Sequence, residues 1–273
     1  MKIINLIENT EGSQGCLFEH GLSFYVEALD RKLLIDTGAT DAFITNAGKL
    51  DVDLGQVDYM ILSHGHYDHA GGILSFAQIN PTAPIFMQKQ AICEYYHKNE
   101  TLEKYIGIDS RIKELPSLKL IDGSYRIEEG ISLFSGVTGR KLWPLGNLEL
   151  MVKRGNEFYQ DDFCHEQYLV IEENEKKVLI SGCAHNGILN ILDKYREIYG
   201  ADPDAVISGF HMQKKSGYSE KDLEMVKETG LQLKKYNTEF YTGHCTGEVP
   251  YEILKEVMGQ KLHYVHSGDE IKV

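Results

Sequence analysis

The stretch SHGHYDHAGG, from Ser63 to Gly72, is the part of the chain that decides the fold. Its ten residues include three histidines, one aspartate and three glycines. The apolar run VDYMIL at residues 57–62 comes directly before it and is typical of a strand that is covered on both faces. The end of this predicted strand is therefore followed by four side chains that can bind a metal, which are His64, His66, Asp68 and His69.

This motif has the chemistry of a metal site. Ligands of α/β proteins usually bind at the carboxyl ends of strands. Gly65 allows a tight fold between the first two histidines, and Gly71 and Gly72 allow close backbone approach before a helix that we expect near residue 73. Imidazole and carboxylate groups suit zinc and other borderline metals, and two ions about 3.5–4 Å apart would form a dinuclear centre. A metal-free histidine turn is the alternative, but buried imidazoles would then lose hydration without compensation.

The composition limits the class of protein. The 273 residues are 42% hydrophobic and 25% charged, which is typical of a globular chain with a sizeable core. The net charge of -13 argues against general nucleic-acid binding. No apolar run is long enough for a membrane span, and the first residues lack a secretory signal. The five cysteines form no C-x-x-C pair, so we expect a cytoplasmic protein. We further expect a small-molecule substrate and no nucleic-acid or membrane partner, and a homodimer is a candidate assembly.

Strand-like and helix-like segments alternate along both halves of the chain, which predicts one α/β domain over residues 1–273 with sheets inside and helices outside. Expected strands lie at residues 2–7, 23–29, 32–36, 57–62, 85–87, 168–171, 178–181, 205–208, 240–242 and 261–265. Expected helices lie at residues 89–105, 187–199 and 249–258. Another helix is expected after Ser219, with Asp222 three residues on as its capping partner. We expect an insertion or lid at about residues 88–130.

At these residues the chain resembles the metallo-β-lactamase superfamily. Residues 64–69 match its H-x-H-x-D-H signature without a gap, and DTG at residues 36–38 matches an element that precedes the signature. SGCAHNGI at 181–188, GFH at 209–211 and GHCTG at 243–247 are similar to one branch of metal-dependent hydrolases. That branch includes enzymes similar to 7,8-dihydropterin-6-methyl-4-(β-D-ribofuranosyl)aminobenzene-5'-phosphate synthase. The resemblance implies a four-layer αββα sandwich and a metal-dependent hydrolase.

The resemblance also implies further ligands, because members of the superfamily add a third histidine, a bridging aspartate and a late histidine. His244 fits the late histidine. Cys183 stands where the aspartate is expected, and both a ligand role and a role as a small buried hydrophobe remain open. Without a carboxylate bridge, the centre could hold one or two zinc ions, with iron or manganese as alternatives.

Two residues compete for the place of the third histidine. The branch resemblance implies His185, whereas His165 opens a predicted strand at the spacing of many superfamily members. Pairing of His165 with Asp161 or Glu166 is the alternative to a ligand role. The expected ligands are His64, His66, Asp68, His69, His185 and His244, with His165 and Cys183 as further candidates.

We expect the chemistry to be hydrolysis by water that a metal activates at neutral pH. Asp68 is expected both to bind metal and to hold the water's proton, and His211 to act as acid or to orient the substrate, with a plain core histidine as the alternative. Arg140 and Lys141, beside the single tryptophan Trp143, suit a small anionic substrate with a ring, such as an ester, lactone or phosphoester. An exposed basic turn would show the same pattern.

Three other functions remain open. A synthase in the same fold would act on a pterin or phosphoribosyl substrate. Iron-dependent redox chemistry is suggested because three of the cysteines lie within two residues of a histidine. A non-catalytic metal-binding protein is the third alternative. The histidines without a motif are expected to be structural, and they are His20, His97, His263 and His266.

Overall fold

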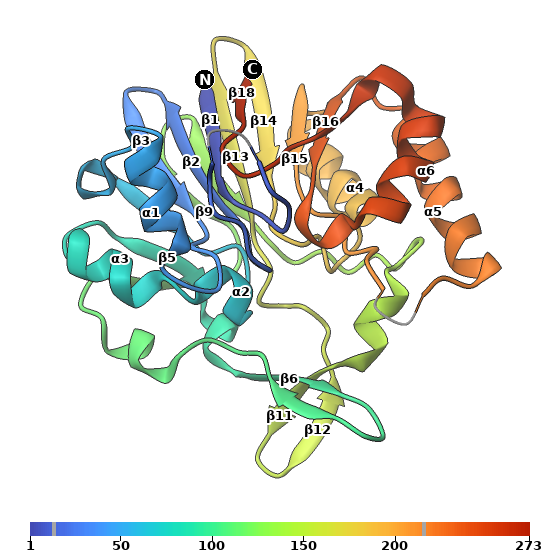
Figure 1. The fold of residues 1–273 in the computed structure, drawn as a ribbon, viewed down its shortest axis with the longest axis horizontal. Helices are drawn as coiled ribbons and strands as arrows, with labels where there is room; N and C mark the ends of the chain where they lie inside the picture. Colours follow the sequence, from blue (N-terminus) through green and yellow to red (C-terminus); the bar gives the residue numbers. More distant parts are fainter. Residues whose placement is uncertain (13–14, 215–216) are drawn as a thin grey trace.

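Two seven-stranded sheets lie face to face in this protein, and helices cover their outer faces (Figure 1). The computed structural model describes residues 1–12, 15–214 and 217–273. In spatial order the first sheet contains β18 (Glu270–Lys272), β1 (Lys2–Ile7), β2 (Ser23–Ala28), β3 (Arg31–Ile35), β4 (Tyr59–Ile61), β5 (Ile85–Gln88) and β8 (Leu118–Ile121). The second contains β17 (Leu262–Tyr264), β16 (Glu239–Thr242), β15 (Ala205–Ile207), β14 (Lys176–Ile180), β13 (Tyr168–Glu173), β10 (Ile131–Phe134) and β9 (Tyr125–Glu128).

The helices divide between the two outer faces. The first sheet carries α1 (Ala42–Lys49) and α3 (Ile73–Ile79), and the second carries α4 (Ile188–Tyr199), α5 (Glu220–Leu233) and α6 (Glu248–Met258) (Figure 1). The short helix α2 (Tyr67–Ala70) holds the end of the histidine motif. The expected four-layer αββα sandwich is confirmed.

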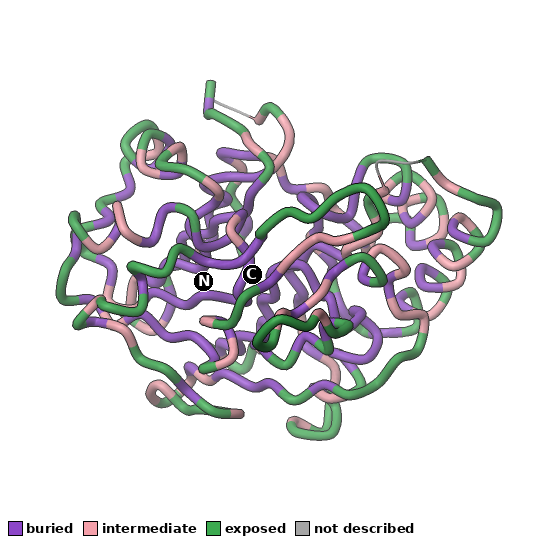
Figure 2. The backbone as a smooth tube through the Cα atoms, turned by 90° about the horizontal axis from the view of Figure 1, so that it is seen from below, coloured by how far each residue is buried: buried purple, intermediate pink, exposed green. Residues whose placement is uncertain are grey.

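Alternation along the strands accounts for the layers. In β3, Leu33 and Ile35 pack against the second sheet, which contributes Val178 and Ile180, whereas Leu34 packs toward Phe43 of α1. Successive side chains of a strand point to opposite faces, so a strand that is apolar at every position must be covered on both sides. Figure 2 shows the result, with buried backbone running through the middle of the molecule.

The cap predicted for α5 is confirmed. The Ser219 hydroxyl accepts from the Asp222 N–H at 3.2 Å, and the Ser219 N–H donates to Asp222 Oδ2 at 2.8 Å. Reciprocal bonds of this kind satisfy two backbone donors that a helix start leaves free. No helix in the described ranges is both long and apolar enough to cross a bilayer.

The helix predicted at residues 89–105 is wrong. The segment instead forms a 3-10 turn, η2 (Lys89–Ile92), and the strands β6 (Glu94–Lys98) and β7 (Glu103–Tyr105). The tyrosines of this segment favour strands, and pairing of β6 with the distant β11 (Leu150–Arg154) outweighs the local helical pattern. The periodicity of a local segment contains no information about a partner strand about fifty residues away.

These strands belong to a small sheet that projects from the sandwich (Figure 1). Its order is β12 (Glu157–Gln160), β11, β6 and β7. The expected insertion at 88–130 is therefore divided, because β8 and β9 belong to the large sheets and β11 and β12 come from outside that range. A lid role for residues 88–130 stays a prediction.

Candidate metal centre

Strand ends from both sheets meet at the candidate centre. The four donors of the opening motif follow β4 of the first sheet. Cys183 and His185 follow β14 of the second sheet, His211 follows β15 and His244 follows β16. Because β14, β15 and β16 are parallel neighbours, their carboxyl ends lie at one edge.

Three buried imidazoles form the first donor group. The ring centroids are 4.6 Å apart for His64 and His66, 4.9 Å for His64 and His185, and 4.8 Å for His66 and His185. The Nε2 atoms of His64 and His185 are 3.3 Å apart, and Phe163 stacks on the His185 ring at 4.6 Å. Burial, reinforced by the neighbouring imidazoles, lowers the pKa of His64 and His185 well below the usual range and that of His66 to about 3. The rings are therefore neutral, which is the form that binds a metal.

Asp68, His69 and His244 form the second donor group. His244 Nε2 lies 3.2 Å from His69 Nε2 and 3.4 Å from Asp68 Oδ2. Burial acts to raise the pKa of Asp68, but His69, His244 and His20 outweigh it and hold that pKa far below the usual value. Burial likewise opposes protonation of His69, yet the carboxylates of Asp36 and Asp68 raise its pKa to about 9.

Cys183 is common to both groups. Its Sγ lies 3.1 Å from His69 Nε2. Donor atoms of Cys183, His64 and His185 lie within 4.8 Å of one another, and so do those of Cys183, Asp68, His69 and His244. Burial raises the pKa of this thiol well above its usual value. The sulfur thus lies between the two groups, where the superfamily pattern places a carboxylate.

Hydrogen bonds fix the orientation of four of these rings. Each Nδ1 contacts an oxygen: His64 with Ser63 Oγ at 2.9 Å, His69 with Asp36 Oδ2 at 2.7 Å, His185 with Asn147 Oδ1 at 3.0 Å and His244 with Asn9 Oδ1 at 2.8 Å. The amide and carboxylate oxygens only accept, and the Ser63 hydroxyl already donates to Asp36, so each Nδ1 carries the proton. A ring that carries only this proton directs the bare Nε2 into the centre, as in ligating histidines, and His69, with its raised pKa, must lose a second proton to reach that form.

His66 also fits a metal ligand. Its buried Nε2 has no hydrogen-bond partner within the described part of the chain, although buried polar atoms are nearly always paired. His66, Asp161 and His165 also offer donor atoms within 4.8 Å of one another, so a further donor group overlaps the first at His66. The chemistry of the donors, mostly imidazole with one carboxylate and one thiol, suits zinc and iron.

His165 lies beside the first donor group and supports it. Its Nδ1 accepts from the Gly65 N–H at 3.0 Å, and its Nε2 donates to Asp161 Oδ2 at 3.0 Å. Tyr95 of β6 packs on the ring at 4.1 Å. Both ring nitrogens of His165 thus have protein partners. It is His185 whose Nε2 lies beside that of His64, at 3.3 Å. Glu166 instead accepts from the His185 N–H at 2.7 Å.

Two more histidines lie at the centre. The His211 ring is 4.0 Å from that of His185, and its buried Nδ1 has no partner among residues that the structure describes. His20 was expected to be structural, but its Nε2 lies 3.5 Å from Asp68 Oδ2 and its ring 5.3 Å from that of His244. Nothing near His20 in the sequence indicates this contact, which arises from tertiary folding. The other histidines without a motif pair with carboxylates elsewhere, His97 with Glu149, His263 with Glu239 and His266 with Glu8.

Several residues with a strained backbone lie at the strand ends that form the centre. Non-glycine residues with positive φ follow four of the strands, at Asp36 (+58°), Ala184 (+49°), His211 (+51°) and His244 (+50°). Such conformations are uncommon outside glycine and persist where the surrounding structure determines them. They turn the chain sharply at the strand ends and bring the donors together.

A cleft of about 710 Å³ opens beside the centre. The guanidinium of Arg140 lies 5.3 Å over the Trp143 ring, and both line this cleft together with Asp161. Because Asp161 also contacts His165, the cleft adjoins the first donor group. Lys141, a candidate substrate residue, is exposed and is not part of this lining.

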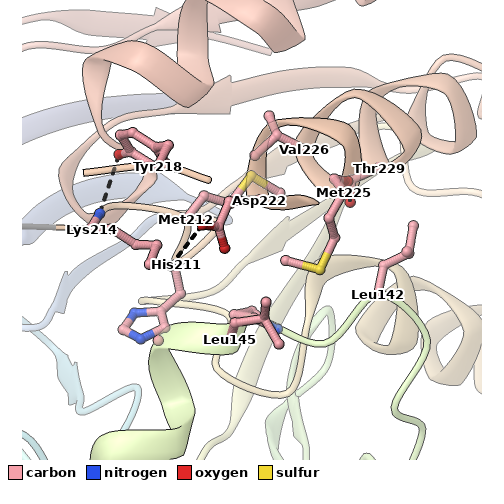
Figure 3. Close-up of a pocket in the computed structure, with 12 residues that line it drawn as sticks. Leu142, Leu145, His211, Met212, Lys214, Tyr218, Asp222, Met225, Val226 and Thr229 are labelled. Carbon is pink, nitrogen blue, oxygen red and sulfur yellow. Dashed lines mark hydrogen bonds and ion pairs between the residues drawn. The ribbon is translucent and has the colours of Figure 1, made fainter. Parts of the chain in front are cut away.

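A second, small cavity of about 20 Å³ adjoins His211 (Figure 3). It shares Leu142, Leu145 and Met225 with the cleft, and two other residues of its lining, Lys214 and Asp222, form an ion pair. The His211 ring therefore contacts the imidazole of His185 and also lines this cavity.

An αββα sandwich with histidine, aspartate and cysteine donors at the ends of its strands is the architecture of a metal-binding protein. The family model of the metallo-beta-lactamase superfamily matches residues 17–211, and the chain belongs to that superfamily.

Similar proteins carry the comparison further. An uncharacterized protein of Methanocaldococcus jannaschii is 29% identical over 252 residues, which are 89% of each chain. The 7,8-dihydropterin-6-methyl-4-(beta-D-ribofuranosyl)-aminobenzene-5'-phosphate synthase of the same organism is 26% identical over 296 residues, covering 100% of this chain and 96% of the synthase. The crystal structure of Tm1679, a metal-dependent hydrolase of the beta-lactamase superfamily, has a TM-score of 0.83 at 31% identity and covers 100% of this chain and 99% of its own.

Proposed function

We propose that this protein is a metal-dependent hydrolase that activates water at a mono- or dinuclear zinc centre and acts on a small anionic ester, lactone or phosphoester. The observation that carries the proposal is the orientation of four imidazoles. The Nδ1 atom of each ring contacts a protein oxygen, and the rings belong to His64, His69, His185 and His244. Orientation of this kind is typical of histidines that bind metal.

The two donor groups would hold the metal in different ways. His64, His66 and His185 would form the first position, and Asp68, His69 and His244 the second, with Cys183 available to both. Zinc suits this donor set, and iron or manganese are alternatives. A cation held there supplies Lewis acidity and makes water a nucleophile at neutral pH.

The chain's own residues supply the rest. The Asp68 carboxylate is kept ionised by the histidines around it, so it can accept a hydrogen bond from the reacting water and orient it. His211 faces the small cavity and is placed to give a proton to a leaving group. Arg140 and Trp143 can bind the charge and the ring of an anionic substrate in the cleft.

Substitution of a donor in each group tests this function. We expect His64→Ala and Asp68→Ala to lose metal and to lower hydrolysis of a panel of lactones, esters and phosphodiesters by about 100-fold or more. His263→Ala, whose exposed ring pairs with Glu239, is the matched control and should retain both. Full metal content with full activity in the two donor variants would exclude this centre as the site of reaction.

A synthase that uses a dihydropterin or phosphoribosyl substrate is the second candidate. It is favoured by the similarity to a named synthase along the whole chain and by the aromatic and cationic lining of the cleft. Tight binding of a dihydropterin phosphate, together with no turnover across the hydrolysis panel, would support it over the hydrolase. Iron as the bound metal, with visible absorbance and redox turnover, would support iron-dependent redox chemistry. Metal binding without turnover of any substrate would support a non-catalytic role.

A further inference from the structure

A second buried thiol lies beside the shared sulfur of the centre. Cys183 and Cys245 are 3% and 5% exposed, and both are free thiols. Their Sγ atoms and a ring nitrogen of His211 lie within 4.8 Å of one another, and Cys245 Sγ lies 3.6 Å from the Cys183 carbonyl oxygen. The outward hydrogen bonds of the four imidazoles do not involve Cys245, so the proposed hydrolase gives this residue no role.

The fold brings the two thiols together across an intervening strand. Cys183 follows β14 and Cys245 follows β16, and β15 lies between these strands. Gly209 lies two residues beyond the end of β15, and a Cβ there would lie only 2.5 Å from Cys245 Sγ. The missing side chain thus leaves the space in which the Cys245 sulfur reaches over the end of β15. The Gly209 N–H donates to the Gly182 carbonyl at 2.8 Å, which holds the β14 end close.

The position of Cys183 makes its chemical state matter for the centre. Its sulfur is 3.1 Å from His69 Nε2 and is the donor common to both groups. A change that turned this sulfur toward Cys245 would remove the shared donor and leave the histidines in place. The donor groups within the described residues include no other cysteine, and Cys93 and Cys164 are exposed.

We propose that Cys183 and Cys245 form an oxidation site at the metal centre, at which hydrogen peroxide converts the two thiols to a disulfide and withdraws the shared donor. This rests on the proposed metal site for its consequence, but not for the disulfide itself. One thiol sulfur attacks the peroxide O–O bond, so that an S–O bond forms and water leaves. The other sulfur then displaces the hydroxyl of the sulfenic acid as a second water, and the S–S bond forms. Two thiols and one peroxide give one disulfide and two waters.

The test uses a full-length variant in which Cys16, Cys93 and Cys164 are replaced by serine, so that only the proposed pair can react. After removal of metal with a chelator, the variant is treated with hydrogen peroxide and mapped by peptide mass spectrometry. We expect a peptide cross-linked between Cys183 and Cys245, an intact mass lower by two hydrogens, and recovery of both thiols with dithiothreitol. Both thiols still reactive in the denatured protein, or Cys183 converted to a sulfinic or sulfonic acid while Cys245 stays reduced, would overturn the proposal.

A second measurement separates this site from the function of the centre. The oxidised variant should bind zinc at least about tenfold more weakly than the reduced one, and reduction should restore the affinity. Adding Cys245→Ser should abolish the cross-link. The reduced protein with this substitution should bind zinc as tightly as the reduced protein without it. If the disulfide forms but zinc affinity is unchanged, the withdrawal of a donor is refuted. If the reduced protein binds no metal at all, the proposed function fails while the mapped disulfide still stands.

Discussion

Asp36 is the residue through which the two donor groups are connected. Its Oδ2 accepts from His69 Nδ1 and from the Ser63 hydroxyl, both at 2.7 Å. The Ser63 hydroxyl in turn contacts His64 Nδ1 at 2.9 Å. One buried carboxylate therefore fixes a ring of the second group directly and a ring of the first group through a serine. Its φ of +58° makes the turn that brings it beneath the motif.

Asp36→Asn tests this connection. Asparagine tolerates a left-handed backbone, so the turn should survive. Its amide can satisfy only part of the three acceptor contacts, and His69 would lose the partner that fixes its tautomer. We expect zinc affinity to fall about 10- to 100-fold, measured by competition with a chelating dye. The exposed Asp41, directly before α1, provides the control, and Asp41→Asn should bind zinc as the unchanged protein does. Equal zinc affinity in the two variants would show that Asp36 does not orient the site.

The sequence predicted residues of the centre where a motif joins them and missed those that only folding joins. The opening motif, His185 and His244 converge as expected, because each follows a predicted strand. Asn9 and Asn147 hold rings from distant loops, and no local pattern distinguishes them from other surface amides. Local spacing specifies where a side chain leaves a strand, whereas the partner that reaches it is set by the tertiary structure.

At the scale of elements, most strands and helices were predictable because their burial follows their own periodicity. The strands at 57–62 and 178–181 and the helix at 187–199 agree with β4, β14 and α4 to within two residues at either end. The failure at 89–105 has a different cause. Tyr95 is buried because β6 pairs with β11 and lies over His165, and both contacts come from elsewhere in the chain.

The contact between the motif loop and η2 gives a prediction for one glycine. A Cβ at Gly65 would lie 2.5 Å from the Ala91 carbonyl oxygen and 2.9 Å from Ala91 Cα, and backbone atoms cannot move aside easily. We expect Gly65→Ala to lower the free energy of unfolding by about 1–3 kcal/mol and to weaken metal binding, because the His64–Gly65 turn must shift. Thermal denaturation with chelator present measures the first effect.

Gly48→Ala is the matched control for that substitution. Gly48 lies in α1 with nothing within 4 Å of the position of an added Cβ, and alanine favours helices over glycine by about 0.5–1 kcal/mol. This variant should therefore be unchanged or slightly more stable. A Gly65→Ala protein as stable as the control would mean that the loop and η2 are not in the close contact described.

At the scale of the whole molecule, each large sheet supplies one part of the centre. The first sheet delivers the motif after β4, and the second delivers Cys183, His185 and His244 after two of its parallel strands. Neither part holds a complete donor group, since His185 joins His64 and His244 joins Asp68. Metal binding should therefore stabilise the contact between the two sheets, and folding and metal affinity should be coupled.

The shifted pKa values of the buried imidazoles make stability depend on pH even without metal. In the metal-free protein His64, His66 and His185 have lowered pKa values, so the unfolded chain binds more protons than the folded one below about pH 6.5. Stability should fall as pH decreases from about 6.5 toward the pKa of His66 at about 3. His69, with its pKa raised to about 9, acts in the opposite sense, because its contribution is complete below about pH 6.5 and is lost as pH rises through 9.

Bound metal should change the pH dependence of stability at alkaline pH. A cation at His69 replaces the proton that this ring otherwise keeps up to about pH 9, so zinc binding should strengthen as pH rises from 6 to 9. A ligand at 100 times its Kd adds about 2.7 kcal/mol to stability, and the zinc-induced rise in Tm should grow with pH accordingly. Calorimetry at pH 5.5, 7 and 9, with chelator or with zinc, measures both effects. A Tm of the metal-free protein that is equal at pH 5.5 and 7, with a zinc-induced rise that does not vary with pH, would show that these buried imidazoles are not the groups that bind the metal.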